Sequence, residues 1–129
     1  MRRGEIYFAA LDPTRGAETQ KTRPVVVVSN NVANRSAAVV TVVPLTSSVE
    51  RVFPFEVLLP ASRSGLSKDS KAMAQQVRTL DKARLNARAA GAVQGDDMRR
   101  LDDALRLHLG LSVLPAKLAS PSRIPDNRA

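Results

Sequence analysis

Residues 24–46, PVVVVSNNVANRSAAVVTVVPLT, hold two runs of β-branched residues on either side of a short polar segment. A continuous β-branched run that starts at a proline is typical of a strand buried on both faces. We therefore predict strands over 24–30 and 37–46. The Asn-rich segment 30–36 between them is typical of a connection rather than of a helix or strand.

Further strands are predicted on both sides of this pair. Upstream, residues 4–11, GEIYFAAL, alternate in hydropathy and lead into 12–16, DPTRG, whose composition is typical of a turn. Downstream, residues 53–60, FPFEVLLP, alternate between two prolines that limit their length, which predicts an edge strand. After a loop over 62–70, residues 71–80, KAMAQQVRTL, are typical of one more strand.

One helix is predicted late in the chain, over residues 96–109. The sequence DDMRRLDDALRLHL places apolar residues at helical spacing and acids in the first turn, and Gly110 follows directly. Several strands followed by one amphipathic helix predict a small, mostly β barrel with the helix packed on it. Because residues 113–129 hold three prolines and few large apolar side chains, we expect a domain over 1–112 and a flexible tail.

Length and charge indicate a single domain with a polyanionic partner. A chain of 129 residues and 13.9 kDa has the length of a single domain. The formal net charge is +8, and residues 1–95 hold fourteen basic against seven acidic residues. A basic surface of this size favours a partner such as nucleic acid.

Composition also argues against several classes of protein. The chain has no Cys and one His, His108, so it lacks the residues for disulfides or a usual zinc site, and we expect no metal or cofactor. It shows no signal-peptide pattern and no membrane-spanning apolar run, so we expect a cytoplasmic protein without a membrane partner. With no Trp, three Phe and one Tyr, it lacks an extensive aromatic platform for single-stranded nucleic acid.

Arg23, Thr46 and Glu18 form the candidate catalytic group. Arg23 stands directly before the first β-branched run, Thr46 directly after the second, and Glu18 in the loop that precedes Arg23. An Arg, a hydroxyl and a carboxylate suffice to cleave a phosphodiester when the nucleophile is the 2′-OH of RNA itself. The carboxylate, or another base, takes the proton, and the Arg and Thr hydrogen-bond the phosphorane oxygens.

Each of these residues alone also fits an ordinary structural role. Arg23 fits a solvated charge at a strand end, Thr46 a turn hydroxyl, and Glu18 a loop charge. Gln76 fits a buried core amide as well as it fits a ligand-facing one. His108, within the amphipathic helix, is interpreted as a surface or core-edge residue.

The ordered motifs of the chain carry a family resemblance. They are RRGEIYFAALDPTRGAE (2–18), TRPVVVVSNN (22–31), VVPLTSS (42–48), PFEVLLP (54–60) and GLSKDSKAMAQQVRTLDKARL (65–85). In this order and spacing the chain resembles the MazF/PemK (Kid) family of toxin endoribonucleases, from residue 2 to about residue 112.

The resemblance implies a fold, an activity and partners. The fold would be an SH3-like small β-barrel with a C-terminal helix, as in the gyrase poison CcdB, assembled as a homodimer. The activity would be metal-independent, sequence-specific cleavage of single-stranded RNA, mRNA included, to 2′,3′-cyclic phosphate and 5′-OH ends, which stops translation and growth. An acidic MazE-like antitoxin would hold the toxin inactive.

The resemblance also implies roles for single residues. Arg23 would contact the scissile phosphate as acid or base, Thr46 would stabilise the phosphorane, and Glu18 would support activity. The expected RNA-binding residues are Arg15, Lys21, Thr22, Ser47, Gln76 and Arg78. The RNA sequence recognised would be set by the loops over 15–22, 46–53 and 61–70.

Some positions depart from the Kid-type pattern. That pattern has a His where this chain has Ala17, and an Arg and an Asp where it has Met73 and Gln75, so a mechanism that needs the His/Asp pair does not apply. Lys71 replaces a residue that is apolar in many relatives. Two other functions stay open at this point: a non-catalytic gyrase poison, as fold does not decide function, and an RNA-binding module without activity.

Overall fold

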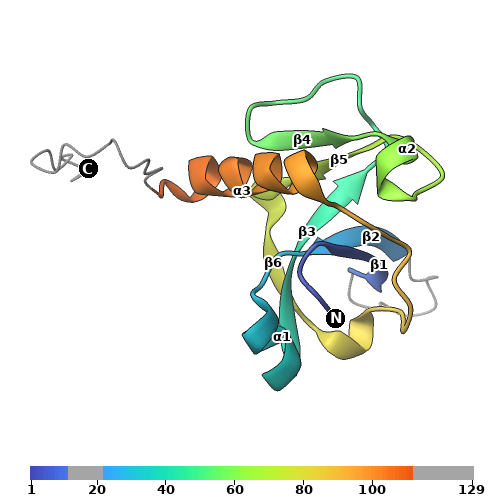
Figure 1. The fold of residues 1–129 in the computed structure, drawn as a ribbon, viewed down its shortest axis with the longest axis vertical. Coiled ribbons are helices and arrows are strands. Elements are labelled where there is room, and N and C mark those ends of the chain that lie inside the picture. The colour runs from blue at the N-terminus through green and yellow to red at the C-terminus, as the bar shows by residue number, and fades with distance from the viewer. Residues whose placement is uncertain (12–21, 112–129) are drawn as a thin grey trace, which may run out of the picture.

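The computed structural model describes residues 1–11 and 22–111 of the chain. Its strands are β1 (Glu5–Ala10), β2 (Thr22–Val27), β3 (Val39–Thr46), β4 (Glu56–Leu59), β5 (Ser70–Met73), β6 (Arg78–Asp81) and β7 (Gly91–Ala92). They form one seven-stranded sheet in the order β4-β5-β3-β2-β1-β7, with β6 also paired to β3. The sheet curls, and helix α3 (Gly95–Leu109) lies along the part of it formed by β4 and β5 (Figure 1).

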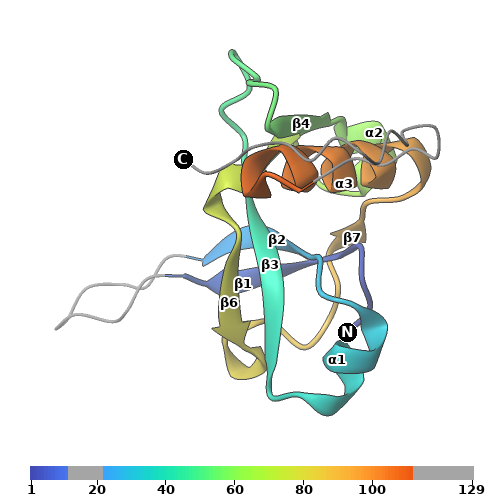
Figure 2. The ribbon, with the colours of Figure 1, turned by 90° about the vertical axis from the view of Figure 1, so that its left-hand side faces the viewer.

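Strand β3 joins the two parts of the sheet. Its Val42 is paired with Val27 of β2 on one side and with Arg78 of β6 on the other. Further along, Thr46 is paired with Lys71 of β5. Figure 2 shows β3 running from near α1 toward α3, with β6 beside it and β1 and β2 crossing behind it. The strand ends of β2 and β3 are therefore held by neighbours on both sides.

Strand β2 is buried on both faces, as its sequence predicts. Val25 and Val27 pack into one core cluster with Tyr7, whereas Val26 packs into a second cluster with Ile6. Successive side chains of a strand point to opposite faces, so β2 separates the two halves of the core. The residue at its start, Arg23, thus stands on a rigid strand.

The predicted C-terminal helix is confirmed as α3. Leu101 and Ala104 are buried, and Gly110 ends the helix in the left-handed conformation with φ 70°. Leu109, which shares the helical spacing, is exposed. The apolar stripe that contacts the sheet therefore ends before the last turn. None of the helices in residues 1–11 and 22–111 is long and apolar enough to cross a membrane.

Two segments predicted as irregular contain short helices instead. The connection over 30–36 is helix α1 (Asn31–Ser36), because the side chain of Asn30 accepts a hydrogen bond from the Ala33 N–H at 2.8 Å and caps the first turn. The loop over 62–70 begins with helix α2 (Ala61–Ser64). The prediction was wrong in both places. In α1 the reason is that capping by Asn30 competes with turn formation over the same few polar residues, whereas α2 has no side-chain cap.

The single strand predicted over 71–80 is wrong as well. It is divided into β5, the 3-10 helix η1 (Ala74–Gln76) and β6. Thr46 is paired with Lys71, so an unbroken antiparallel ladder would bring residue 75 opposite Val42, but Arg78 stands there. The three residues of η1 take up this difference in register. The division of the chain at 112/113 remains a prediction, because residues 112–129 lie outside the described part.

Candidate functional site

Arg23 and Thr46 stand next to each other at the ends of neighbouring strands. In the β2–β3 ladder Val25 is paired with Pro44, so Arg23 and Thr46 each stand two residues beyond this pair on neighbouring strands, and both line the same two cavities. Cross-strand neighbours point to the same face of a sheet. On their other sides, Arg23 is paired with Ala9 of β1 and Thr46 with Lys71 of β5.

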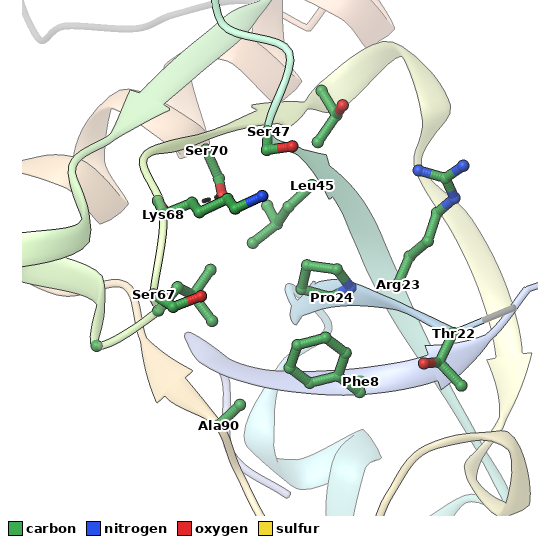
Figure 3. A pocket seen from close by; sticks show the side chains of 13 residues that line it. Phe8, Thr22, Arg23, Pro24, Leu45, Ser47, Ser67, Lys68, Ser70 and Ala90 are labelled. Carbon is green, nitrogen blue, oxygen red and sulfur yellow. Dashed lines mark hydrogen bonds between the residues drawn. The ribbon is translucent and has the colours of Figure 1, made fainter.

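The larger of two cavities beside this pair has a volume of about 650 Å³ (Figure 3). Its apolar lining residues are Phe8, Pro24, Leu45, Leu66 and Ala90, together with Gly65. Its hydroxyl-bearing lining residues are Thr22, Thr46, Ser47, Ser67 and Ser70. The cationic side chains that line it are those of Arg23 and Lys68.

The smaller cavity, of about 360 Å³, adjoins the same pair. It is also lined by Arg23 and Thr46, and in addition by Gln76 and Arg78. Because the two cavities share Arg23 and Thr46, these side chains form their common wall. An extended chain lying across both cavities would pass over the Arg and the hydroxyl.

The hydroxyl of Thr46 is oriented by the chain that follows it. Its oxygen accepts a hydrogen bond from the Ser48 N–H at 3.2 Å, which leaves the hydroxyl proton to be donated. Arg23 is exposed, and no carboxylate among residues 1–11 and 22–111 forms an ion pair with its guanidinium. Hydrogen-bond donors from both side chains can thus be offered to a phosphate.

The structure brings most of the predicted site residues to these cavities. Thr22 and Ser47 line the larger cavity, and Gln76 and Arg78 the smaller one. Gln76 is exposed on η1, so it is not the buried core amide that was the alternative. His108 is exposed on α3 and lines neither cavity. The remaining predicted residues, Arg15, Glu18 and Lys21, lie outside the described residues.

Lys68 was missed as a candidate. It lies in the loop between α2 and β5, and in sequence it has the appearance of an ordinary surface lysine between serine and aspartate. The sequence indicates only that the loop over 61–70 contributes to recognition of the RNA sequence. Its place in the cavity wall depends on the packing of α2, for which the local sequence carries no signal.

Lys71 does not line either cavity and instead forms a buried ion pair with Glu56. Its Nζ lies 2.8 Å from Glu56 Oε1, and the two side chains are 10% and 3% exposed. The ammonium also donates to the carbonyl of Arg51 at 2.6 Å. Along β4 Glu56 and its neighbour Val57 are both buried, and the pair with Lys71 explains how a carboxylate is accommodated there.

Glu56 is hydrogen-bonded from three sides. It accepts from the Phe53 N–H at 3.0 Å and from Gln75 Nε2 at 2.6 Å as well as from Lys71. Burial raises the pKa of Glu56, but these hydrogen bonds together outweigh burial, so the pKa lies below its ordinary value. The loop between β3 and β4 is thereby tied to the sheet through Arg51 and Phe53.

Comparison with known proteins gives the family. The PemK-like, MazF-like toxins of type II toxin-antitoxin systems match residues 2–109. The chain belongs to this family. The resemblance read from the motifs is therefore confirmed.

Two endoribonucleases align with this chain over nearly their whole length. Endoribonuclease MazF9 of Mycobacterium tuberculosis is 49% identical over 116 residues, which cover 86% of this chain and 98% of the relative. Endoribonuclease EndoA of Bacillus subtilis is 34% identical over 112 residues, covering 86% and 96%.

Solved structures confirm the predicted fold. The MazE-MazF crystal structure (Form-II) from Deinococcus radiodurans contains a chain 27% identical, with a TM-score of 0.73 over 87% of this chain and 97% of that one. An endoribonuclease in complex with its cognate antitoxin from Mycobacterial species is 30% identical, with a TM-score of 0.70 over 88% and 99%. The MazF-like barrel, a curled sheet with a C-terminal helix, is thus the fold of this chain.

Proposed function

We propose that this chain is a toxin endoribonuclease that cuts single-stranded RNA, mRNA included, at specific sequences without a metal ion. The observation that carries the proposal is the placement of Arg23 beside Thr46 on the common wall of two cavities. The proposal is also supported by the 49% sequence identity between this chain and a protein named as an endoribonuclease. The +8 charge supports a polyanionic substrate.

In the proposed reaction the 2′-OH of the RNA attacks the adjacent phosphorus. The bond from O2′ to phosphorus forms, the bond from phosphorus to O5′ breaks, and the products carry a 2′,3′-cyclic phosphate and a 5′-OH. A base takes the 2′-OH proton, for which Glu18 is the candidate, and O5′ receives a proton as it leaves. Arg23 and Thr46 donate hydrogen bonds to the phosphorane oxygens, where preorganised donors act most strongly.

The RNA would lie across both cavities. Thr22 and Ser47 would contact it on one side of the scissile phosphate, and Gln76 and Arg78 on the other. Arg15 and Lys21 are proposed as additional contacts from the preceding loop. Cleavage of mRNA would stop translation and growth in the cytoplasm.

An acidic MazE-like antitoxin is the proposed inhibitor, and a homodimer the proposed assembly. Relatives of the same fold have been crystallised as MazE-MazF and as a complex with a cognate antitoxin. An acidic antitoxin segment would be attracted by the same basic surface as RNA and would compete with it. Inhibition and catalysis would then share one groove.

The test is cleavage of a long mixed-sequence RNA in EDTA, with the new 5′-OH ends mapped by sequencing. Wild-type protein is expected to give discrete ends that share a short motif, and Arg23→Ala to give none. The matched control is Arg35→Ala, which removes an equal charge from an exposed position on α1, away from both cavities, and is expected to cut like wild type.

Cleavage by Arg23→Ala at the wild-type rate would contradict the assigned mechanism. No cleavage by folded wild-type protein would contradict the function itself. A supercoiling assay with DNA gyrase then separates the gyrase poison from the inactive RNA-binding module, since only the former traps cleaved DNA.

A further inference from the structure

The larger cavity differs in chemistry from a phosphate site. Phe8, Pro24, Leu45 and Leu66 line it together with several hydroxyl groups, and its two cations are Arg23, shared with the smaller cavity, and Lys68. A phosphate has three or more oxygens that need donors, and an apolar surface leaves some of them unpaired. A nucleobase instead has two apolar faces and a polar edge, which fits an apolar cavity with polar groups at its border.

Lys68 supplies a donor at that border. Figure 3 shows its ammonium pointing into the cavity, from the side opposite Arg23 in this view. Among residues 1–11 and 22–111 no carboxylate forms an ion pair with it. The ammonium carries three N–H donors and no acceptor, so at a base edge it can donate to a carbonyl oxygen but repels an amino group.

The loop that carries Lys68 is held at both ends. Asp69 Oδ1 accepts a hydrogen bond from the Ala61 N–H at 2.8 Å, and Ser70 Oγ donates to the Lys68 carbonyl at 3.3 Å. Helix α2, just before the loop, is joined to α3 by Arg63, whose Nε and Nη2 lie 2.9 and 3.1 Å from the Asp97 carboxylate. A side chain on such a braced loop can read a base edge selectively.

We propose that the larger cavity is a nucleobase subsite next to the scissile phosphate and that Lys68 determines its specificity. The inference rests on the proposed function, since Arg23 and Thr46 on the cavity wall are taken to hold the phosphate. The occupant is guanine or uracil, whose O6 or O4 carbonyl oxygen would accept from the ammonium of Lys68. Adenine and cytosine are disfavoured, because they carry an exocyclic amino group in place of that oxygen, and this donor would face the donor of Lys68.

The test measures binding separately from cleavage. A random single-stranded RNA library with fluorine at every 2′ position lacks the nucleophile, so bound molecules stay intact and can be sequenced. The proteins compared are wild type, Lys68→Met, which keeps the length of the side chain but removes the ammonium, and Arg35→Met as the charge-matched control. All three are first checked for equal melting temperature.

Wild type and Arg35→Met are expected to select guanine or uracil at one position. Lys68→Met is expected to weaken that preference about five- to tenfold while keeping the preferences at other positions. An unchanged selection by Lys68→Met overturns the proposal. So does an equal loss at every position, which would make Lys68 a contact to the backbone, and so does a wild type that selects no base.

The cleavage experiment distinguishes this failure from failure of the proposed function. If wild type cuts RNA and Lys68→Met keeps the same cleavage motif, the subsite is wrong while the endoribonuclease stands. If the library shows the Lys68-dependent preference but wild type cuts nothing, the subsite stands and the activity is wrong.

Discussion

At the scale of single residues, two polar groups near the ends of the same strands have opposite roles. Thr46 is half-buried at a cavity wall, and its hydroxyl can donate to a ligand. Lys71, its neighbour across the ladder, is buried against Glu56 and satisfied within the protein. The first residue is therefore expected to affect the reaction and the second to affect stability.

Thr46→Val is expected to fold normally and to cut RNA about 10²- to 10³-fold more slowly, the usual loss for one donor to a developing oxyanion. Single-turnover cleavage and thermal unfolding measure the two quantities. Thr41→Val, the same substitution on the same strand at a position that lines neither cavity, serves as the control. Equal rates for the two variants would remove Thr46 from the mechanism.

Lys71→Met is expected to lower the free energy of unfolding at neutral pH by about 3 kcal/mol, because it leaves the Glu56 carboxylate buried without its cation. The folded-state pKa of Glu56 is lowered, so ionised Glu56 contributes stability that is present above its ordinary pKa of 4.5 and is lost as the pH falls through the lower folded value. The difference between wild type and variant should therefore shrink in acid.

Urea denaturation at neutral and at acidic pH measures this difference. Lys82→Met is the control, since the Lys82 ammonium bonds the Asn34 carbonyl and no carboxylate in the part of the chain that the structure describes. A Lys71→Met difference that stays constant with pH would show that the pair with Glu56 does not account for the loss.

At the scale of elements, the wall of the larger cavity depends on where α2 sits. Gly91 in β7 lies so close to this helix that a Cβ added there would be 2.1 Å from the Ser64 carbonyl oxygen. Backbone atoms cannot give way as the end of a side chain can. A side chain at position 91 must therefore move α2, and with it the loop that carries Lys68.

Gly91→Ala is expected to destabilise the fold by about 1–3 kcal/mol and also to reduce RNA cleavage. Gly95→Ala separates the two effects: its φ of 55° strains an alanine, but a Cβ there meets nothing within 4 Å, so stability should fall and cleavage by the folded protein should not. Melting temperatures and cleavage rates below them give both readouts. Normal cleavage by Gly91→Ala would show that α2 does not set the cavity wall.

At the scale of the whole molecule, the basic surface should make RNA binding depend on salt. Among the described residues, three cationic side chains line the two cavities, those of Arg23, Lys68 and Arg78. Released counterions give a slope of log K against log salt of about −0.7 per phosphate contact on single strands. Because Lys68 is assigned to a base, Arg23 and Arg78 predict a slope of about −1.4. Arg15 and Lys21 would steepen it.

Arg78→Gln is expected to reduce that slope by about 0.7 and to weaken binding to all RNA sequences alike. Fluorescence anisotropy with a 2′-fluoro oligonucleotide at several salt concentrations measures the slope, with Arg35→Gln as the control. A slope near zero for wild type would contradict an electrostatic role for this surface.

The sequence by itself determined strands β1 to β4, the late helix and the positions of Arg23 and Thr46. β-Branched runs and helical spacing are properties of residues close together in the chain, so they can be recognised in the sequence. Both candidate residues stand where such β-branched runs begin or end. The family motifs added an expected role for each residue. The short helix α1 was not predicted, because the same polar residues can form either a turn or a capped helix, and the cap provided by Asn30 decides for the helix.

Only the tertiary structure decided which of these positions meet. The register difference that forms η1, the burial of Glu56 against Lys71, and the arrival of Lys68 at the cavity all depend on pairing between segments far apart in sequence. Such pairing is set by the packing of the whole core, which cannot be predicted from a short stretch of sequence alone. The chemistry available to this protein is thus visible in its sequence, whereas the shape of its substrate site follows from the fold.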